Sequence, residues 1–371
     1  AASSPMRMMG ALSGGAWAAH MISDLGDGRF DGAWLAQNFE TLQPEKAIWD
    51  KYANLFAHAD TERERFLEFE RWWNGYYTLS REEILGITQN LFIGNRLERG
   101  EMQLDAHCTV DLKRIRNPLI IFASDGDNIT PPEQAMGWIG KLYPDTDALK
   151  AAGQRIVYMT HPRVGHLGIF VSGSVARLQH RAILESLDDV EALSPGLYEM
   201  VIDNPSGDPD CETGDFEVRF EPREVDDLGI ASDDAALKQV AQISWINEAV
   251  YSTFVSPWIR AATTPASAEA LRALHPMRWT RTMFSEQVNP WMALIKSTAE
   301  TLRETRSPLP DDHPAIVAER ELSARTGEGI GAWRKGRDAW IGHVFGAMFH
   351  PFPVTTAPTQ AEKPSATSNK E

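Results

Sequence analysis

The sequence predicts an α/β protein built around a parallel sheet. Two continuous apolar runs, residues 117–124 and 155–160, have the length of buried strands. Between them, residues 132–143 form a helical pattern, with Pro132 in the first turn and Glu133 near the positive end of the helix dipole. A strand, a helix and a strand within this length are typical of a parallel βαβ unit, whose strand ends carry the chemistry.

A helical region rich in large aromatic residues precedes this unit. Phe66, Phe69 and Trp73 recur at positions i, i+3 and i+7, so they share one face of a helix. Each ring taken alone is explained by an ordinary packed core. Together they suggest a helical cap over about residues 30–105 that covers something apolar. The expected members of this cap include Trp72, Trp73 and Tyr76.

The chain changes character after residue 190. Residues 196–202 and 215–222 are typical of two strands, which we interpret as an appended hairpin around an acidic loop. From about residue 235 the pattern is helical again, and Pro257 interrupts it. One apolar stripe of this helix comprises Ile243, Ile246, Val250 and Phe254. Further helices are expected at residues 267–274, 288–305 and 314–349.

These patterns divide the chain into four parts. The expected parts are a lid and sheet domain over residues 1–190, a β-hairpin insertion over 191–230, a helical region over 231–350 and a disordered tail over 351–371. The chain begins with alanine rather than an initiator methionine, so we interpret it as a piece of something longer.

Composition and charge exclude several classes of function. The chain has 52 acidic and 36 basic residues and no basic run of five, so we expect no nucleic-acid partner. No apolar run reaches the roughly 18–20 residues needed to span a bilayer, and no signal peptide is visible. Its two cysteines, Cys108 and Cys211, support neither a disulfide framework nor a zinc site. We therefore expect a soluble, cytoplasmic protein without a transmembrane segment.

The loops that follow the two apolar runs hold the candidate catalytic residues. Asp127 follows the first run, and His166 follows the second run 39 residues later. In α/β-hydrolases the last two members of the catalytic triad come in this order, acid and then histidine. The carboxylate fixes the tautomer of the imidazole, and the imidazole takes the proton from a Ser or Cys nucleophile. We therefore predict that Asp127 orients His166 in an acid–base pair.

Neighbouring residues offer alternatives to this assignment. Asp125 and Asp127 are also explained as turn residues, since Asp-Gly and Asp-Asn favour loops. Asp127 is preferred because a proline follows it four residues later, as is common for the acid of hydrolases. His161 precedes a proline and is interpreted as a loop residue. His166 lies between Gly165 and Gly168, whose small size allows close backbone approach.

The motifs around these residues resemble a known family. The stretches "NLFIGNRLERGEM", "VDLKRIRNPLIIFASDGDNITPPEQAMGWI" and "GHLGIF" resemble the C-terminal half of the catalytic domain of poly(3-hydroxyalkanoate) synthases. Most of the chain is more similar still to a bacterial family of polyhydroxyalkanoate-synthase-like proteins of unknown function. The resemblance implies a partial α/β-hydrolase fold with a helical cap, in which Asp127 and His166 are the acid and the base.

The nucleophile of such a site is missing from the sequence. The segment "ALSGG" around Ser13 differs by one position from the G-x-S-x-G elbow of hydrolases. An elbow must follow a buried strand, and only nine residues with a proline among them precede "GALSGG", so Ser13 is interpreted as a helix-packing residue. Cys108 approaches the acid strand and also forms no elbow. In the relatives named above, the elbow lies upstream of the segment that "PMRMMGAL" matches.

The function predicted from these observations is that of a fragment of an acyltransferase or hydrolase. A Cys or Ser outside the chain would attack an ester or thioester, and no metal or organic cofactor is implied. If the resemblance extends to chemistry, the acyl donor is similar to a 3-hydroxyacyl-coenzyme A thioester. The alternative is a non-catalytic scaffold whose cap and helices bind a partner or the surface of a polyester granule.

Overall fold

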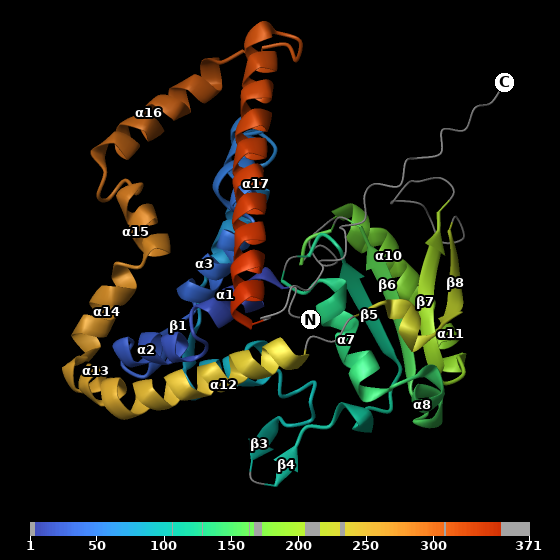
Figure 1. Ribbon diagram of the computed structural model, residues 1–371. Helices are drawn as coiled ribbons and strands as arrows, with labels where there is room; N and C mark the ends of the chain where they lie inside the picture. Colours follow the sequence, from blue (N-terminus) through green and yellow to red (C-terminus); the bar gives the residue numbers. More distant parts are fainter. Residues whose placement is uncertain are drawn as a thin grey trace, which may run out of the picture.

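The computed structural model is a mixed α/β protein that is mostly helical and contains one four-stranded sheet (Figure 1). The sheet lies on one side of the molecule, and the N-terminal helices and the long helix α17 lie on the other. Among the described residues, no helix combines the length and the apolar character needed to cross a membrane. The structure describes residues 4–105, 107–127, 129–162, 164–166, 173–204, 216–230, 234–307 and 309–349.

The sheet contains the βαβ unit predicted from the sequence. Strand β5 (Leu119–Ser124) pairs in parallel with β6 (Arg155–His161), and helix α7 (Pro132–Leu142) connects them. In this register Ser124 lies opposite His161, so both strands end at the same edge of the sheet. The predicted α/β class is confirmed, and the loops that leave β5 and β6 start side by side.

The hairpin predicted near residue 200 completes this sheet. Strand β7 (Gly196–Asp203) and strand β8 (Glu217–Arg223) pair antiparallel, and β7 also pairs in parallel with β6. The order is therefore β5-β6-β7-β8. The hairpin is therefore part of the main sheet rather than an appendage, because alternation of side chains shows that a segment is a strand but not which strand lies beside it. Cys211 lies outside the described residues.

Helices cover both faces of the sheet. Ile156 and Tyr158 pack in one core with Ile139 of α7, whereas Val157 and Met159 pack in a second core on the opposite face. Successive side chains of a strand point to opposite faces, which explains why the run in β6 is apolar throughout. The covering helices are α7 and α8 (Thr146–Ala151) on one face and α10 (Gly173–Glu185) and α11 (Leu187–Ala192) on the other.

The cap region is mainly helical, as predicted, but the aromatic residues of its helices α4 (Lys51–Ala57) and α5 (Arg63–Trp73) are not buried in a core. Neither α4 nor α5 contains a buried residue. The last α-helix of the cap, α6 (Arg81–Ile87), begins with a capping box. The Ser80 hydroxyl accepts the backbone N–H of Glu83, and the Glu83 carboxylate accepts the backbone N–H of Ser80. The elements are β1 (Arg29–Asp31), α3 (Ala33–Leu42), η1 (Glu45–Asp50), α4 (Lys51–Ala57), α5 (Arg63–Trp73), β2 (Thr78–Ser80), α6 (Arg81–Ile87), η2 (Thr88–Phe92), β3 (Gln103–Asp105) and β4 (Cys108–Thr109).

The N-terminal helices α1 (Pro5–Leu12) and α2 (Trp17–Leu25) are joined by a glycine pair that packs against α12 (Asp234–Val250). Gly15 has a φ of +94°, and a Cβ on it would lie only 2.7 Å from the Cα of Ser244. The hydroxyl of Ser244 accepts the backbone N–H of Ala16 at 3.0 Å. A side chain at this glycine would therefore push α12 away from α1 and α2.

A buried polar cluster lies at the same helix junction. His20 Nδ1 lies 2.5 Å from Glu248 Oε1, and His20 Nε2 lies 3.6 Å from Asp24 Oδ2. Asp24 also accepts the hydroxyl of Tyr251 at 2.9 Å and forms an ion pair with Arg81 at 2.7 Å. The cluster thus links α2, α6 and α12 through groups that neutralise one another.

The C-terminal helices form an open frame beside the cap (Figure 1). The apolar stripe predicted on α12 and its continuation is exposed, with fractions between 39% for Ile243 and 68% for Phe254. The predicted tail, residues 351–371, lies outside the described residues. The elements after α12 are η5 (Tyr251–Val255), α13 (Ser256–Ala262), α14 (Pro265–Ala273), α15 (Pro276–Met283), α16 (Pro290–Thr305) and α17 (Pro314–Phe349).

Candidate active site

The loop after β5 presents the Asp127 carboxylate in a fixed orientation. Its Oδ1 accepts the backbone N–H groups of Ile129 at 2.8 Å and Thr130 at 2.9 Å. Asp side chains favour such local turns because the carboxylate replaces a backbone acceptor. Pro132 then starts α7, as the sequence predicted. Asp127 is 7% exposed. Its Oδ1 holds the loop, which leaves Oδ2 for a contact outside the loop.

The loop after β6 brings His166 to that second oxygen. His166 Nδ1 lies 2.9 Å from Asp127 Oδ2. An ionised carboxylate can only accept a hydrogen bond, so Nδ1 carries the proton and the Nε2 of the neutral imidazole is the basic nitrogen. The His166 side chain is 40% exposed. No hydrogen bond from any residue that the structure describes reaches Nε2.

The contact shifts both pKa values in the directions that favour an ion pair. Burial raises the pKa of Asp127, but hydrogen bonds from His166, Thr130 and Ile129 outweigh burial and place this pKa below its usual value. The hydrogen bond to Asp127 raises the pKa of His166 against the opposing effect of burial. Asp127 therefore stabilises the imidazolium that forms when His166 accepts a proton.

The neighbouring candidates have other contacts. Asp125 is exposed, and its backbone N–H bonds to the carbonyl of His161 at 3.0 Å. The ring of His161 accepts the N–H of Val164 at 3.1 Å, which closes the loop that carries His166. The structure thus brings Asp127, and not Asp125, to His166. Gly168 of the histidine loop lies outside the described residues.

His166 faces a cavity whose other walls come from the cap. The cavity has a volume of about 810 Å³ and is also lined by Ile129 and Gly165 from the two loops. Tyr76 does not line the cavity. The guanidinium carbon of Arg278 lies over the Tyr76 ring instead, 4.9 Å from the ring centroid. The aromatic wall consists of Phe39, Phe66, Phe69, Trp72 and Trp73. The sequence pattern identified four of these rings, and two of the three expected cap residues, Trp72 and Trp73, line the same cavity as His166.

The candidate nucleophiles of the described chain lie elsewhere. The hydroxyl of Ser13 donates to the carbonyl of Gly10 at 2.9 Å at the end of α1. Cys108 is an exposed free thiol on β4. Neither lines the cavity, and none of the described residues that do is a Ser, Thr or Cys. The contact between Asp127 and His166 thus forms without a candidate nucleophile among the described residues that line the cavity.

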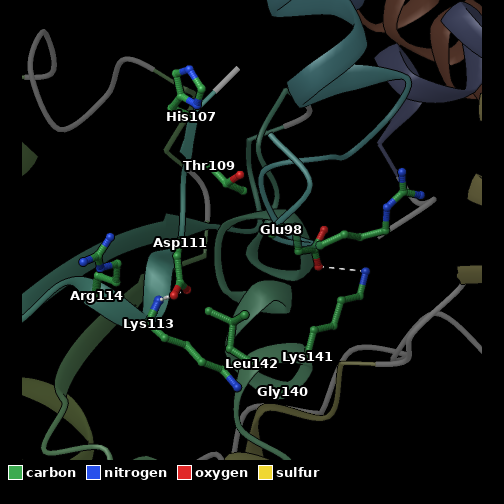
Figure 2. Close-up of a pocket in the computed structure, with 11 residues that line it drawn as sticks. Glu98, His107, Thr109, Asp111, Lys113, Arg114, Gly140, Lys141 and Leu142 are labelled. Carbon is green, nitrogen blue, oxygen red and sulfur yellow. Dashed lines mark hydrogen bonds and ion pairs between the residues drawn. The ribbon is translucent and has the colours of Figure 1, made fainter. Parts of the chain in front are cut away.

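A second cavity of about 1020 Å³ lies near the C-terminal end of α7, the opposite end from Asp127 (Figure 2). Its walls carry charges of both signs, and Lys141 pairs with Glu98 at 2.7 Å. Asp111 accepts the backbone N–H of Lys113 at 2.9 Å. The lining carries four cationic side chains and two carboxylates, so it has an excess of positive charge; these residues are Arg99, Lys113, Arg114, Lys141, Glu98 and Asp111. Within the described part of the chain, no group of three or more His, Cys, Asp or Glu residues is placed to hold a metal ion.

Comparison with known proteins assigns the family. The family model described as "Protein of unknown function (DUF3141)" matches residues 1–371. The chain belongs to the DUF3141 family. No solved structure gives a significant match to this DUF3141 chain.

Two curated proteins are similar to the DUF3141 chain. The "Uncharacterized protein in ackA 5'region" of Rhizobium meliloti is 42% identical over 340 residues, covering 89% of this chain and 46% of that protein. The "Poly(3-hydroxyalkanoate) polymerase subunit PhaC" of Haloferax mediterranei is 26% identical over 149 residues, covering 39% of this chain and 28% of that protein. The chain therefore spans less than half the length of either relative, and the resemblance to polymer synthases is weak and partial.

Proposed function

We propose that this chain supplies the base and the orienting acid of an α/β-hydrolase-type active site that acts on esters or thioesters. The observation that carries the proposal is the 2.9 Å contact between His166 Nδ1 and Asp127 Oδ2, in a histidine that lines a cavity and whose Nε2 has no partner among the described residues. The order of the two residues at neighbouring strand ends, acid and then histidine, supports it.

In this proposal His166 transfers protons and Asp127 holds it in place. Nε2 removes the proton from a Ser or Cys nucleophile, which attacks the substrate carbonyl and forms an acyl intermediate. The imidazolium then gives that proton to the departing alcohol or thiol. A second nucleophile, water or an acceptor hydroxyl, releases the acyl group with the same help from His166. The ionised Asp127 stabilises the imidazolium in both steps.

The nucleophile itself belongs, in this proposal, to a part of the full-length protein outside these residues. The hydroxyl of Ser4, at the start of α1, donates to the carbonyl of Ile129 at 3.3 Å. Ile129 lies two residues beyond Asp127, so a segment preceding Ser4 in a longer polypeptide would start beside the acid loop. The site then has the parts of a triad, and it requires no metal or organic cofactor.

The substrate is proposed from the partial similarity to the polymerase subunit. That similarity, 26% over 149 residues, supports an acyl donor similar to a 3-hydroxyacyl-coenzyme A thioester. Synthesis and cleavage of the ester use the same first half-reaction and differ only in the acceptor.

A second candidate function is binding to an apolar surface without catalysis. Several tryptophans of the C-terminal helices are largely exposed, including Trp258 at 78% and Trp291 at 69%. Large exposed apolar groups mark interaction surfaces. A partner protein or the neutral surface of a polyester granule would suit them, because the net charge of −16 repels anionic surfaces.

The test compares the full-length protein with its His166→Ala variant. We expect the wild type to hydrolyse or transfer acyl groups from nitrophenyl esters or acyl-coenzyme A. The variant should be at least about a thousandfold slower, the scale of losses on removing a triad member. Turnover that survives in the variant, or that disappears instead in Ser13→Ala, would overturn the proposal. Absence of turnover in the wild type favours the binding function.

A further inference from the structure

The aromatic wall of the cap cavity is not explained by packing of the cap. Trp72 and Phe69 keep exposed fractions of 58% and 37%, although both line the cavity. Helix α5, which carries them, contains no buried residue. Exposed apolar surface of this extent, gathered on one concave wall, marks a site that an apolar ligand covers.

The rings are held in place before any ligand arrives. Phe69 stacks on Trp73 with a centroid distance of 6.0 Å and an interplanar angle of 12°, and it lies 5.8 Å from Trp72. The indole N–H of Trp73 donates to Glu40 Oε1 at 2.9 Å. Ring pairs at these distances attract each other, so the wall is a preformed surface rather than a set of free side chains.

The charged groups around the wall are largely occupied with one another. Lys51 pairs with Glu70 at 2.6 Å, and Arg65 Nε donates to Glu62 at 2.7 Å. The lining also contains the cation Lys46 and the carboxylate Glu40, so charges of both signs are present around the apolar rings. An apolar and uncharged ligand fits these walls better than an anion does.

His166 lies on the same cavity as these rings, which ties the apolar wall to the reacting end of the site. A substrate whose reacting carbonyl lies near Nε2 could extend its acyl chain into this cavity, toward α5. The volume of about 810 Å³ lies in the range of roughly 300–1,000 Å³ that holds drug-sized ligands, far more than an acetyl group needs.

We propose that the cap cavity is the acyl-chain site of this protein and that it takes the neutral, apolar tail of medium-chain or arylalkyl esters and thioesters. Identifying the tail as an acyl chain rests on the proposed function, whereas the preference for an apolar chain rests on the cavity alone. Each added methylene gains about the same burial energy, so affinity rises with chain length until the cavity is filled.

The experiment measures binding of uncharged 1-butanol, 1-hexanol and 1-octanol to the full-length protein by calorimetry. We expect affinity to rise roughly tenfold for every two methylene groups. Trp72→Ala should weaken octanol binding at least fivefold. Because Trp72 is more than half exposed, this variant should fold. Tyr77→Ala, which removes an exposed aromatic ring of the cap that does not line the cavity, is the control and should bind octanol like the wild type.

A second variant keeps the test independent of Trp72. Ala47 lines the cavity, so Ala47→Leu narrows it and should weaken octanol binding more than butanol binding. Equal affinity for the three alcohols, or equal losses in Trp72→Ala and Tyr77→Ala, would overturn the acyl-chain site.

The measurements of octanol binding and of acyl turnover can contradict the two proposals independently. Octanol binding reports on the aromatic wall, whereas the loss of acyl turnover in His166→Ala reports on the proposed base. Octanol binding in a protein without acyl turnover contradicts the proposed function and supports the apolar site. Turnover that shows no preference for longer acyl chains, without octanol binding, contradicts the apolar site and supports the proposed function.

Discussion

His166 and His20 both lie beside carboxylates, yet the two histidines can do different things. His166 has one carboxylate, at Nδ1, and its side chain is 40% exposed on a cavity. His20 is buried at a helix junction, with Glu248 at one ring nitrogen and Asp24 at the other. Among the described residues none bonds to Nε2 of His166, whereas His20 has Glu248 of α12 at one nitrogen and Asp24 of its own helix α2 at the other.

Residue types alone therefore do not mark a catalytic pair. A histidine and a carboxylate in contact are a structural tie when both ring nitrogens face carboxylates, and a candidate acid–base pair when one nitrogen faces space for a substrate. Substitutions in the Asp127–His166 pair should therefore change mainly activity, and substitutions in the His20 cluster should change mainly stability.

The largest expected effect is on activity. Asp127→Asn keeps the shape of the side chain but removes its charge, so His166 loses the partner that selects its tautomer and stabilises its cation. We expect acyl turnover by the full-length protein to fall about a thousandfold or more in steady-state assays. Asp125→Asn, two residues away and exposed, is the control and should keep wild-type turnover. Equal losses in both variants would remove the distinction between the two acids.

The next effect is on stability. His20→Ala leaves Glu248 and Asp24 without their shared partner at a buried junction. We expect the free energy of unfolding to fall by about 2–3 kcal/mol in urea titrations, because buried charged groups lose a compensating contact. Turnover per folded molecule should stay unchanged. His107→Ala, an exposed histidine, should leave the unfolding curve unaltered. A loss of turnover in His20→Ala without a loss of stability would contradict the structural role.

A smaller change to the same cluster should have a smaller effect. Tyr251→Phe removes the hydroxyl that donates to Asp24 but keeps the ring, whose centroid lies 5.0 Å from that of His20. We expect a loss of about 1 kcal/mol in the free energy of unfolding. Urea titration of the single and double variants with His20→Ala measures their coupling. Strict additivity of the two losses would show that the groups do not act as one network.

The smallest effect concerns the pH dependence of stability at the candidate site. The pKa of His166 is raised, so its contact with Asp127 stabilises the folded state fully below the unfolded pKa of about 6.5 and less as pH rises through the folded pKa. The wild type should therefore exceed His166→Ala in stability by more at pH 5.5 than at pH 9. The difference should stay below about 1 kcal/mol, because the ring is partly exposed. A difference that grows with pH would contradict the raised pKa.

The sequence predicted those features that have a local cause. The runs that became β5 and β6 are apolar throughout because both faces of the sheet are covered, and Asp127 stands out because its turn and the following prolines are encoded within six residues. The helical cap and its shared aromatic face also follow from spacing along the chain.

Features that join distant segments had no such signal. The parallel pairing of β7 with β6 depends on strand neighbours, which periodicity does not specify. Likewise, Ile243 and Phe254 were recognised as one stripe, but spacing does not tell whether anything covers that stripe. His20 and Glu248 are 228 residues apart, so only the folded chain shows that they form one cluster.

The most direct test of the candidate site is an NMR titration of His166 in the wild type and in Asp127→Asn. We predict a wild-type pKa of His166 above the ordinary value of about 6.5, and a lower pKa in the variant. In the wild type the neutral ring should carry its proton on Nδ1 and none on Nε2. A His166 pKa that stays at or below about 6.5 and does not change when Asp127 loses its charge would contradict the acid–base pair.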